Sequence, residues 1–180
     1  MQYSLIYLVR TFSDLYLLTF LLRFVMQWAR ADFYNPVAQF VVRVTNPLVV
    51  PARRFLPRAR FIDAPTLIVL VALEALVTWL LLAIGNFAMP GGYFVALVIL
   101  RLIDLTLWLY TLAILIYAVL SWISQGHTPI GALLEDLVAP VLRPVRRVIP
   151  LIGGLDLSPL IVLILIQAIR YALPLPGLLR

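Results

Sequence analysis

The sequence predicts an all-α membrane protein whose four transmembrane helices come from two copies of one helical unit. Three observations support this prediction. Hydrophobic residues make up 64% of the 180 residues and charged residues only 12%, the mean hydropathy is +1.06, and a segment rich in proline and arginine occurs twice. A soluble domain of ordinary composition is far less apolar.

The duplicated segment reads NPLVVPARRFLP over residues 46–57 and APVLRPVRRVIP over residues 139–150. An offset of about 93 residues superimposes the prolines and the paired arginines, which indicates a tandem repeat. The shared pattern is P-x-x-x-P-x-R-R-x-x-P. Its positions, together with an aspartate that follows each segment, are Pro47, Pro51, Arg53, Arg54, Pro57 and Asp63 in the first copy, and Pro140, Pro144, Arg146, Arg147, Pro150 and Asp156 in the second.

Each copy is predicted to contain an apolar helix, an interfacial helix with the Pro/Arg segment, and a second apolar helix. The copies cover residues 1–90 and 91–180, with spans at about 4–27 and 63–86 and at about 93–122 and 156–173. Crossing the hydrocarbon core takes ~20 residues. Two spans return the chain to its starting side, so the copies are expected to be parallel repeats related by an axis along the membrane normal.

The helix before each Pro/Arg segment is too short to cross a membrane. Asn35-Pro36 and Thr128-Pro129 are typical helix starts. Apolar residues then recur at helical spacing, which predicts an amphipathic helix in the interface. Because proline removes a donor and clashes with the carbonyl four residues back, the Pro/Arg segments themselves are predicted to form short helical or extended pieces.

The net charge of +6 comes from arginine, since the sequence contains no lysine. Guanidinium groups at a membrane edge can bind phosphates bidentately, so anionic phospholipid is the expected partner and nucleic acid is not. The alternative is that these arginines only set topology. Either way, the Arg-rich loops face the cytoplasm and both termini lie outside. The candidate lipid- or partner-binding residues are Arg53, Arg54, Arg58, Arg143, Arg146 and Arg147.

Polar side chains interrupt all four spans in their middle or outer halves. Ionised groups there cost a few kcal/mol or more, so they should turn inward and pair. One interpretation is a structural clamp, in which Arg10 pairs with Asp14 and Arg101 with Asp104, within or between helices. A second is a path for ions or protons. The full set is Arg10, Asp14, Glu74, Arg101, Asp104, Gln167 and Arg170, with Glu74 and Gln167 closing the network.

Other polar residues have simpler interpretations. Arg23, near the end of the first span, is predicted to snorkel to the interface. Asp63 and Asp156 are predicted to cap the helices that follow them. His127 is the only histidine and cysteine is absent, and no metal-ligand spacing or nucleophile with a base occurs in the sequence. We therefore expect no enzymatic activity, cofactor or metal.

The paired motifs resemble the YggT family, also called YlmG in other bacteria and in plastids. The resemblance rests on NP followed by P-x-R-R-x-x-P, and on Asp63-Ala64-Pro65 and Asp156-Leu157-Ser158-Pro159 at the next helix starts. It covers essentially the whole chain in a two-copy form. It implies a multi-pass inner-membrane protein without established enzymatic activity, linked with cell or plastid division, nucleoid distribution, membrane-complex assembly and osmotic tolerance through ion uptake.

The resulting hypothesis is a non-enzymatic assembly or scaffold protein of the bacterial inner membrane. Its expected partners are anionic lipid and a membrane-complex or division protein, which it would engage through Arg53, Arg54, Arg146 and Arg147. The alternative is a potassium or proton transporter or channel subunit linked to osmotic stress. Four spans leave little room for a pore, so that alternative would call for a homo-oligomer.

Overall fold

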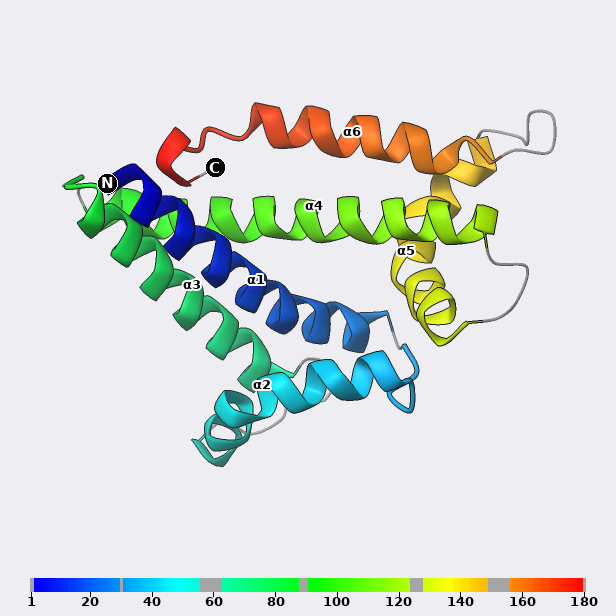
Figure 1. Cartoon of the computed structure of the whole chain (residues 1–180), viewed down its shortest axis with the longest axis horizontal. Coiled ribbons are helices and arrows are strands. Elements are labelled where there is room, and N and C mark those ends of the chain that lie inside the picture. The colour runs from blue at the N-terminus through cyan, green and yellow to red at the C-terminus, as the bar shows by residue number, and fades with distance from the viewer. Residues whose placement is uncertain are drawn as a thin grey trace.

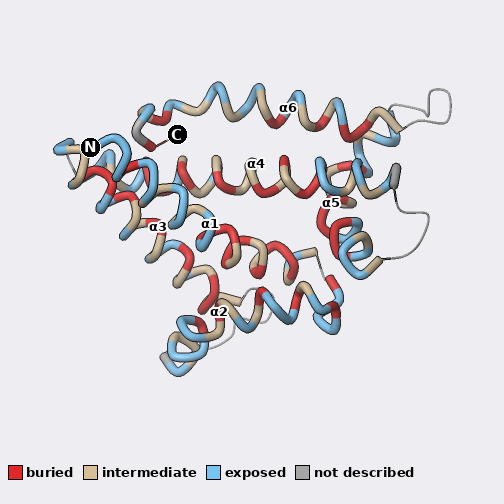
Figure 2. Tube along the Cα trace, viewed as in Figure 1, coloured by how far each residue is buried: buried red, intermediate tan, exposed pale blue. Residues whose placement is uncertain are grey.

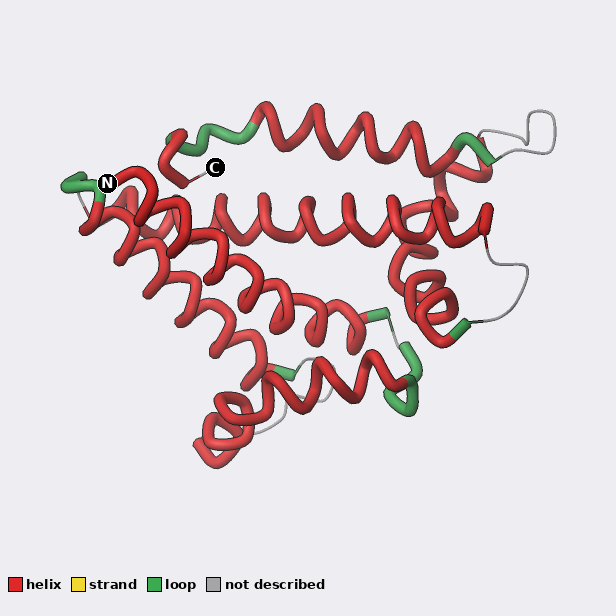
Figure 3. The backbone as a smooth tube through the Cα atoms, viewed as in Figure 1, coloured by secondary structure: helices red, strands yellow, loops and turns green. Residues whose placement is uncertain are grey.

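A computed structural model describes residues 2–29, 31–55, 63–87, 91–123, 128–148 and 156–179. These residues form mostly α-helices, and no strand occurs within the described ranges (Figure 3). The helices are α1 (Gln2–Trp28), α2 (Pro36–Phe55), α3 (Ala64–Ile84), α4 (Gly91–Ile123), α5 (Pro129–Val148) and α6 (Ser158–Ala172), followed by the 3-10 helix η1 (Gly177–Leu179).

The apolar helices α1, α3, α4 and α6 run back and forth between two ends of the molecule (Figure 1). Both chain termini and the junction between α3 and α4 lie at one end, which we name the terminal end. The amphipathic helices α2 and α5 lie toward the other end, which we name the arginine end. Helices α2 and α5 contact each other, so the two copies are joined at the arginine end.

Three helices are long and apolar enough to cross a membrane: α1, α3 and, over Gly91–Ser121, α4. The fourth predicted span is shorter than expected. Helix α6 contains 15 residues, or roughly 22 Å at the usual rise, against a hydrocarbon core of ~30 Å. It ends at Ala172, just before Pro174 and Pro176.

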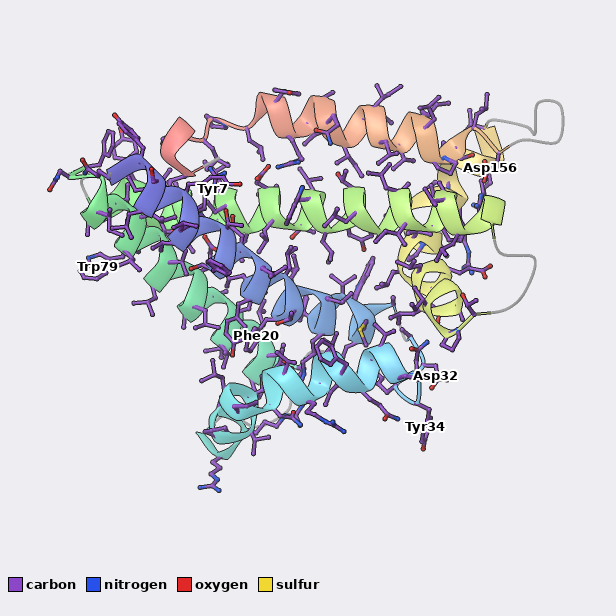
Figure 4. All side chains as sticks on the ribbon, in the orientation of Figure 1. Tyr7, Phe20, Asp32, Tyr34, Trp79 and Asp156 are labelled. Atoms are coloured by element: carbon purple, nitrogen blue, oxygen red, sulfur yellow. The ribbon has the colours of Figure 1, made fainter. Side chains whose placement is uncertain are left out.

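The long helices expose much of their apolar surface. Only 22–33% of the most apolar window in each candidate span is buried. Figure 2 shows exposed residues along the outward sides of these helices, and Figure 4 shows Trp79 pointing away from α3. Other exposed apolar side chains include Phe12, Leu76, Ile99 and Ile164. Such continuous apolar surface is what a lipid-embedded bundle presents.

The largest buried cluster lies where α1, α2, α3, α4 and α5 meet. Phe20 and Met26 of α1 are fully buried there, beside Leu70 of α3 and Leu105 of α4. A second cluster joins α4, α5 and α6 through Ile114, Leu142 and Val162. The amphipathic helices therefore bury their apolar faces against the long helices rather than standing apart from them.

The prediction that the Pro/Arg segments break into short pieces is wrong. Helix α2 continues through Pro47 and Pro51, and helix α5 continues through Pro140 and Pro144. All four prolines are exposed and lie four residues apart in each helix. The carbonyls that lose their donors therefore face outward, where polar surroundings can hydrogen-bond them. Pro57 and Pro150 lie outside the described residues.

The predicted starts of the amphipathic helices are confirmed. The Asn35 side-chain oxygen accepts from the Val37 N–H at 3.0 Å, and the Thr128 hydroxyl oxygen accepts from the Gly131 N–H at 3.1 Å. These bonds satisfy amides that a helix start leaves free. The Asn35 amide also donates to the Pro129 carbonyl at 2.5 Å, which ties the start of α2 to the start of α5.

Candidate functional site

Arg101 of α4 connects three helices inside the bundle. Its Nε donates to Glu74 Oε1 of α3 at 2.5 Å, and its Nη2 donates to Asp14 Oδ1 of α1 at 2.6 Å. Thr78 also donates to Glu74 Oε1, at 3.0 Å. The Arg101 and Glu74 side chains are only 4% and 0% exposed. Water screens an ion pair little in such surroundings. Removing either partner would leave the other charge buried and uncompensated.

A second ion pair holds α6 to α4. Arg170 donates to both carboxylate oxygens of Asp104, from Nε at 2.8 Å and from Nη2 at 3.2 Å. The two side chains are 22% and 15% exposed, more than Arg101 and Glu74. The bidentate geometry fixes the orientation of the guanidinium plane.

The charged residues of the spans therefore have partners other than those that helical spacing suggested. Asp14 binds Arg101 rather than Arg10, and Asp104 binds Arg170 rather than Arg101. Interhelical pairs turn the charges toward the bundle, whereas pairs along one helix would leave them on its surface. Gln167 is half-buried and takes part in none of these bonds.

Charged side chains also line a pocket of about 290 Å³ between α1, α4 and α6. The pocket lies toward the terminal end, near Tyr7, which Figure 4 labels between α1 and α4. The residues that line it are Tyr7, Arg10, Thr11, Asp14, Arg101, Asp104, Leu105, Trp108, Arg170 and Leu179. Arginine and aspartate side chains from three helices thus meet around one internal space.

At the arginine end, Asp63 joins α1, α2 and α3. Its Oδ2 accepts from Gln27 at 2.9 Å, from Arg53 at 3.0 Å and from the Thr66 hydroxyl at 2.7 Å. Burial alone would raise the Asp63 pKa, but these three hydrogen bonds outweigh it and hold the pKa below its usual range. Asp63 occupies the N-cap position of α3, as predicted, but its carboxylate makes no cap hydrogen bond to the helix backbone.

Asp156 occupies the equivalent position before α6 (Figure 4). Its Oδ1 accepts from the Ser158 N–H at 2.9 Å, as expected for an acidic group at a helix start, and its Oδ2 accepts from Arg146 Nε at 2.8 Å. Burial would raise the Asp156 pKa, but the bonds from Ser158 and Arg146 lower it. Arg146 also lies 5.9 Å from the ring centre of Tyr117.

The structure divides each arginine pair into two kinds of residue. Arg53 and Arg146 are held by the aspartates ten residues further on. Arg54 and Arg147 are exposed, as is Arg143. Sequence reasoning missed the Arg–Asp pairing, although an aspartate at the same distance from both arginine pairs was the available signal. Arg58 lies outside the described residues, as does His127.

Arg23 is buried rather than snorkelling to the interface. It is 2% exposed, and its Nη1 donates to Thr45 at 2.6 Å and to Asn46 at 3.0 Å. The prediction of interfacial anchoring is therefore wrong, because α2 lies across the end of α1 and supplies acceptors at that depth. Together with Gln27, this arginine was not among the predicted site residues, yet both join α1 to neighbouring elements.

The fold and its buried charges define a helical membrane protein with a duplicated, arginine-bearing amphipathic helix. The sequence model of the CCB3/YggT family matches residues 2–84 and again residues 96–176. The chain belongs to this family, one match falling on each copy of the duplicated unit.

Similar proteins occur in several bacteria. "Uncharacterized protein YggT" of Escherichia coli strain K12 is 40% identical over 168 residues, which cover 93% of this chain and 87% of the relative. "Uncharacterized protein in proC 3'region" of Vibrio alginolyticus is 41% identical over 167 residues, or 91% of this chain and 90% of the relative. An uncharacterized protein of Pseudomonas aeruginosa is 38% identical over 168 residues, covering 91% and 85%. No solved structure matches the chain.

Proposed function

We propose that this protein is a non-enzymatic assembly or scaffold protein of the bacterial inner membrane. In this proposal the arginine end faces the cytoplasm, both termini lie outside, and α6 completes a fourth crossing beside α4. The observation that carries it is the division of each arginine pair at the arginine end, where one arginine is held by an aspartate and the next is exposed.

The arginines that pair with aspartates position the neighbouring exposed arginines for binding. Arg53 and Arg146 fix the ends of α2 and α5 relative to the helices that follow. The neighbouring Arg54 and Arg147 are then presented from an ordered backbone, which reduces the entropy lost when they bind a phosphate. Anionic phospholipid is the proposed ligand of these two residues and of Arg143.

A protein partner would use the remaining polar surface of the amphipathic helices. On α5 this surface carries exposed Glu135 and Asp136, whereas on α2 it carries exposed Gln39 and Arg43. Because this surface is acidic on α5 and basic on α2, the two helices would not bind two identical partners. Together they suit a single partner, from a membrane complex or division assembly, that binds both surfaces in one orientation.

The test compares the exposed with the held arginines. The double variant Arg54→Gln/Arg147→Gln should lose enrichment of phosphatidylglycerol over phosphatidylcholine in the protein's lipid shell while thermal stability stays unchanged. The matched variant Arg53→Gln/Arg146→Gln should lose stability. If all four substitutions together leave lipid enrichment, partner recovery and cellular function intact with topology unchanged, the proposal fails.

Ion movement is the second candidate, favoured by the charged pocket of the bundle. It predicts saturable potassium or proton flux into liposomes that contain the purified protein. The variant Glu74→Gln, checked for intact folding, should abolish that flux because it removes the charge that orients Arg101. Absence of flux in folded, correctly inserted protein would leave the scaffold function as the proposal.

A further inference from the structure

Two cavities meet at the terminal end of the molecule. The outer one, of about 430 Å³, is lined by the start of α1, the turn after α3 and the region of η1. The inner one is the charged pocket of about 290 Å³ described above. Tyr7 and Arg10 line both cavities. Arg10 therefore stands at the junction between an outer vestibule and an inner charged pocket.

Among the described residues, none hydrogen-bonds Arg10 at this junction. It is half-buried and makes no hydrogen bond within the described residues, although its charge acts on Asp14 one helical turn further on. It lies roughly 12 Å along the helix axis from the first residue of α1, inside a candidate membrane span. A guanidinium carries five donors and is costly to leave without acceptors in apolar surroundings.

The inner pocket offers donors rather than acceptors. Three arginines and two aspartates line its wall. Asp104 already binds Arg170 with both oxygens, and Asp14 binds Arg101. Arg101 also keeps a buried Nη1 without a hydrogen-bond partner among the described residues. Glu74 balances the charge from behind Arg101, but it is fully buried and does not line the pocket.

This arrangement favours an oxyanion over a cation. A cation would need carboxylate oxygens, and three of the four on the wall are held by guanidinium groups. An oxyanion such as a phosphate accepts from a planar guanidinium through two parallel hydrogen bonds. The vestibule adds the exposed rings of Tyr3, Tyr7 and Phe87 around its rim, and such rings are suited to the headgroup level of a membrane.

We propose that the terminal end binds a phosphate group through Arg10, with Arg101 and Arg170 adding positive potential from the inner pocket. The phosphate belongs either to a phospholipid headgroup that enters from the outer leaflet or to a free phosphate ion. The site lies at the terminal end, whereas Arg54 and Arg147 belong to α2 and α5 at the arginine end, so it is separate from the lipid contacts proposed above (Figure 1).

Trp108 provides a reporter, because it lines the inner pocket. A variant with Trp28, Trp79 and Trp122 replaced by phenylalanine leaves Trp108 as the only tryptophan of the full-length chain. Purified in phospholipid-free detergent, it would be titrated with inorganic phosphate at constant ionic strength. In parallel it would be titrated with phosphatidylglycerol and with diacylglycerol, which carries no phosphate.

A saturable change in Trp108 fluorescence is expected in one of the phosphate-bearing arms. A response to inorganic phosphate identifies a free-anion site, whereas a response to phosphatidylglycerol but not to diacylglycerol identifies a headgroup site. Arg10→Gln should raise the half-saturating concentration about tenfold or more, and Arg10→Lys should raise it less. Asp32→Asn, which removes one exposed charge in the loop before α2, should leave it unchanged.

Arg10→Gln is expected to fold because Arg10 makes no hydrogen bond within the described structure, and its circular dichroism and elution volume check this. Two results would overturn the proposal. One is that no titration gives a saturable response in the folded protein. The other is a saturable response that has the same half-saturating concentration in Arg10→Gln as in the parent.

Discussion

The two copies of the duplicated motif make the same ion pair in different surroundings. In the first copy, Asp63 is 8% exposed and receives side-chain donors from α1, α2 and α3. In the second copy, Asp156 is 28% exposed and its side-chain donor is Arg146, which is itself 37% exposed. Both copies therefore contain the Arg–Asp ion pair, but the pair is more buried in the first copy than in the second.

The terminal end shows the same contrast. Arg101 joins α4 to both long helices of the first copy through nearly inaccessible charges, whereas α6 is joined to α4 through the more exposed Arg170 and Asp104. Helices α1, α3 and α4 thus form a tightly linked unit at this end, and α6 is attached to it by weaker contacts. Removing one partner of an ion pair costs more when the remaining charge is buried away from water than when it is exposed.

The largest effect should come from Arg101→Leu. It removes the cation shared by Asp14 and Glu74 and leaves both carboxylates in the bundle, so the free energy of unfolding should fall by ~3–5 kcal/mol. Reversible unfolding in mixed detergent, followed by circular dichroism, measures this loss. Arg143→Gln is the control, and an equal loss in both variants would remove the contrast between the buried and exposed charges.

Asp63→Asn should have the next largest effect. An amide keeps the shape but weakens three hydrogen bonds and leaves Arg53 without its counter-charge, so we expect a loss of ~2–3 kcal/mol. The same unfolding measurement applies. Thr66→Val removes only one of the three donors and should cost less. If the two variants were equally stable, Asp63 would not act as the shared acceptor.

Acid should destabilise the protein through the same aspartates. The pKa of Asp63 is lower in the folded chain than the ~3.9 of a free aspartate, so its contribution is fully present above that value and is lost as pH falls through the folded pKa. The loss of stability between pH 5 and pH 3 should be smaller in Asp63→Asn than in the parent. An identical pH dependence in both proteins would contradict this assignment.

Asp156→Asn should have the smallest effect of the series, about 1 kcal/mol or less, because its ion pair is solvent-exposed. The informative quantity is its ratio to the loss in Asp63→Asn. Added salt should weaken the Asp156 pair more than the Asp63 pair, since exposed charges are screened more strongly. Equal losses in the two variants would show that enclosure does not distinguish the copies.

The sequence predicted the elements better than their partners. Hydropathy placed α1, α3 and α4 within a couple of residues, and proline after Asn35 and Thr128 marked the starts of α2 and α5. Apolar periodicity and helix-start chemistry are local properties, so one sequence contains them. The prolines led to the wrong prediction that the Pro/Arg segments break into short pieces. The free-energy cost of proline within a helix depends on the face it occupies, and the sequence alone did not show that these prolines lie on the exposed faces of α2 and α5.

The pairing of the charged residues could not be predicted from local sequence patterns. The spacing of Arg10 and Asp14 allowed a pair along one helix, yet Asp14 binds an arginine 87 residues away. That choice depends on the crossing of α1 and α4, which no local pattern encodes. Arg23 shows the same limit, since its burial depends on α2 lying across the end of α1.

The bridge made by Arg101 also constrains how the chain enters a membrane during synthesis. Glu74 is translated 27 residues before Arg101, so α3 emerges from the ribosome before its counter-charge exists. Release of α3 alone into lipid would place an unpaired carboxylate there, whereas release of α3 and α4 as one hairpin neutralises it. The insertion machinery would therefore have to retain α3 until α4 is made, which makes the pair a single unit of biogenesis.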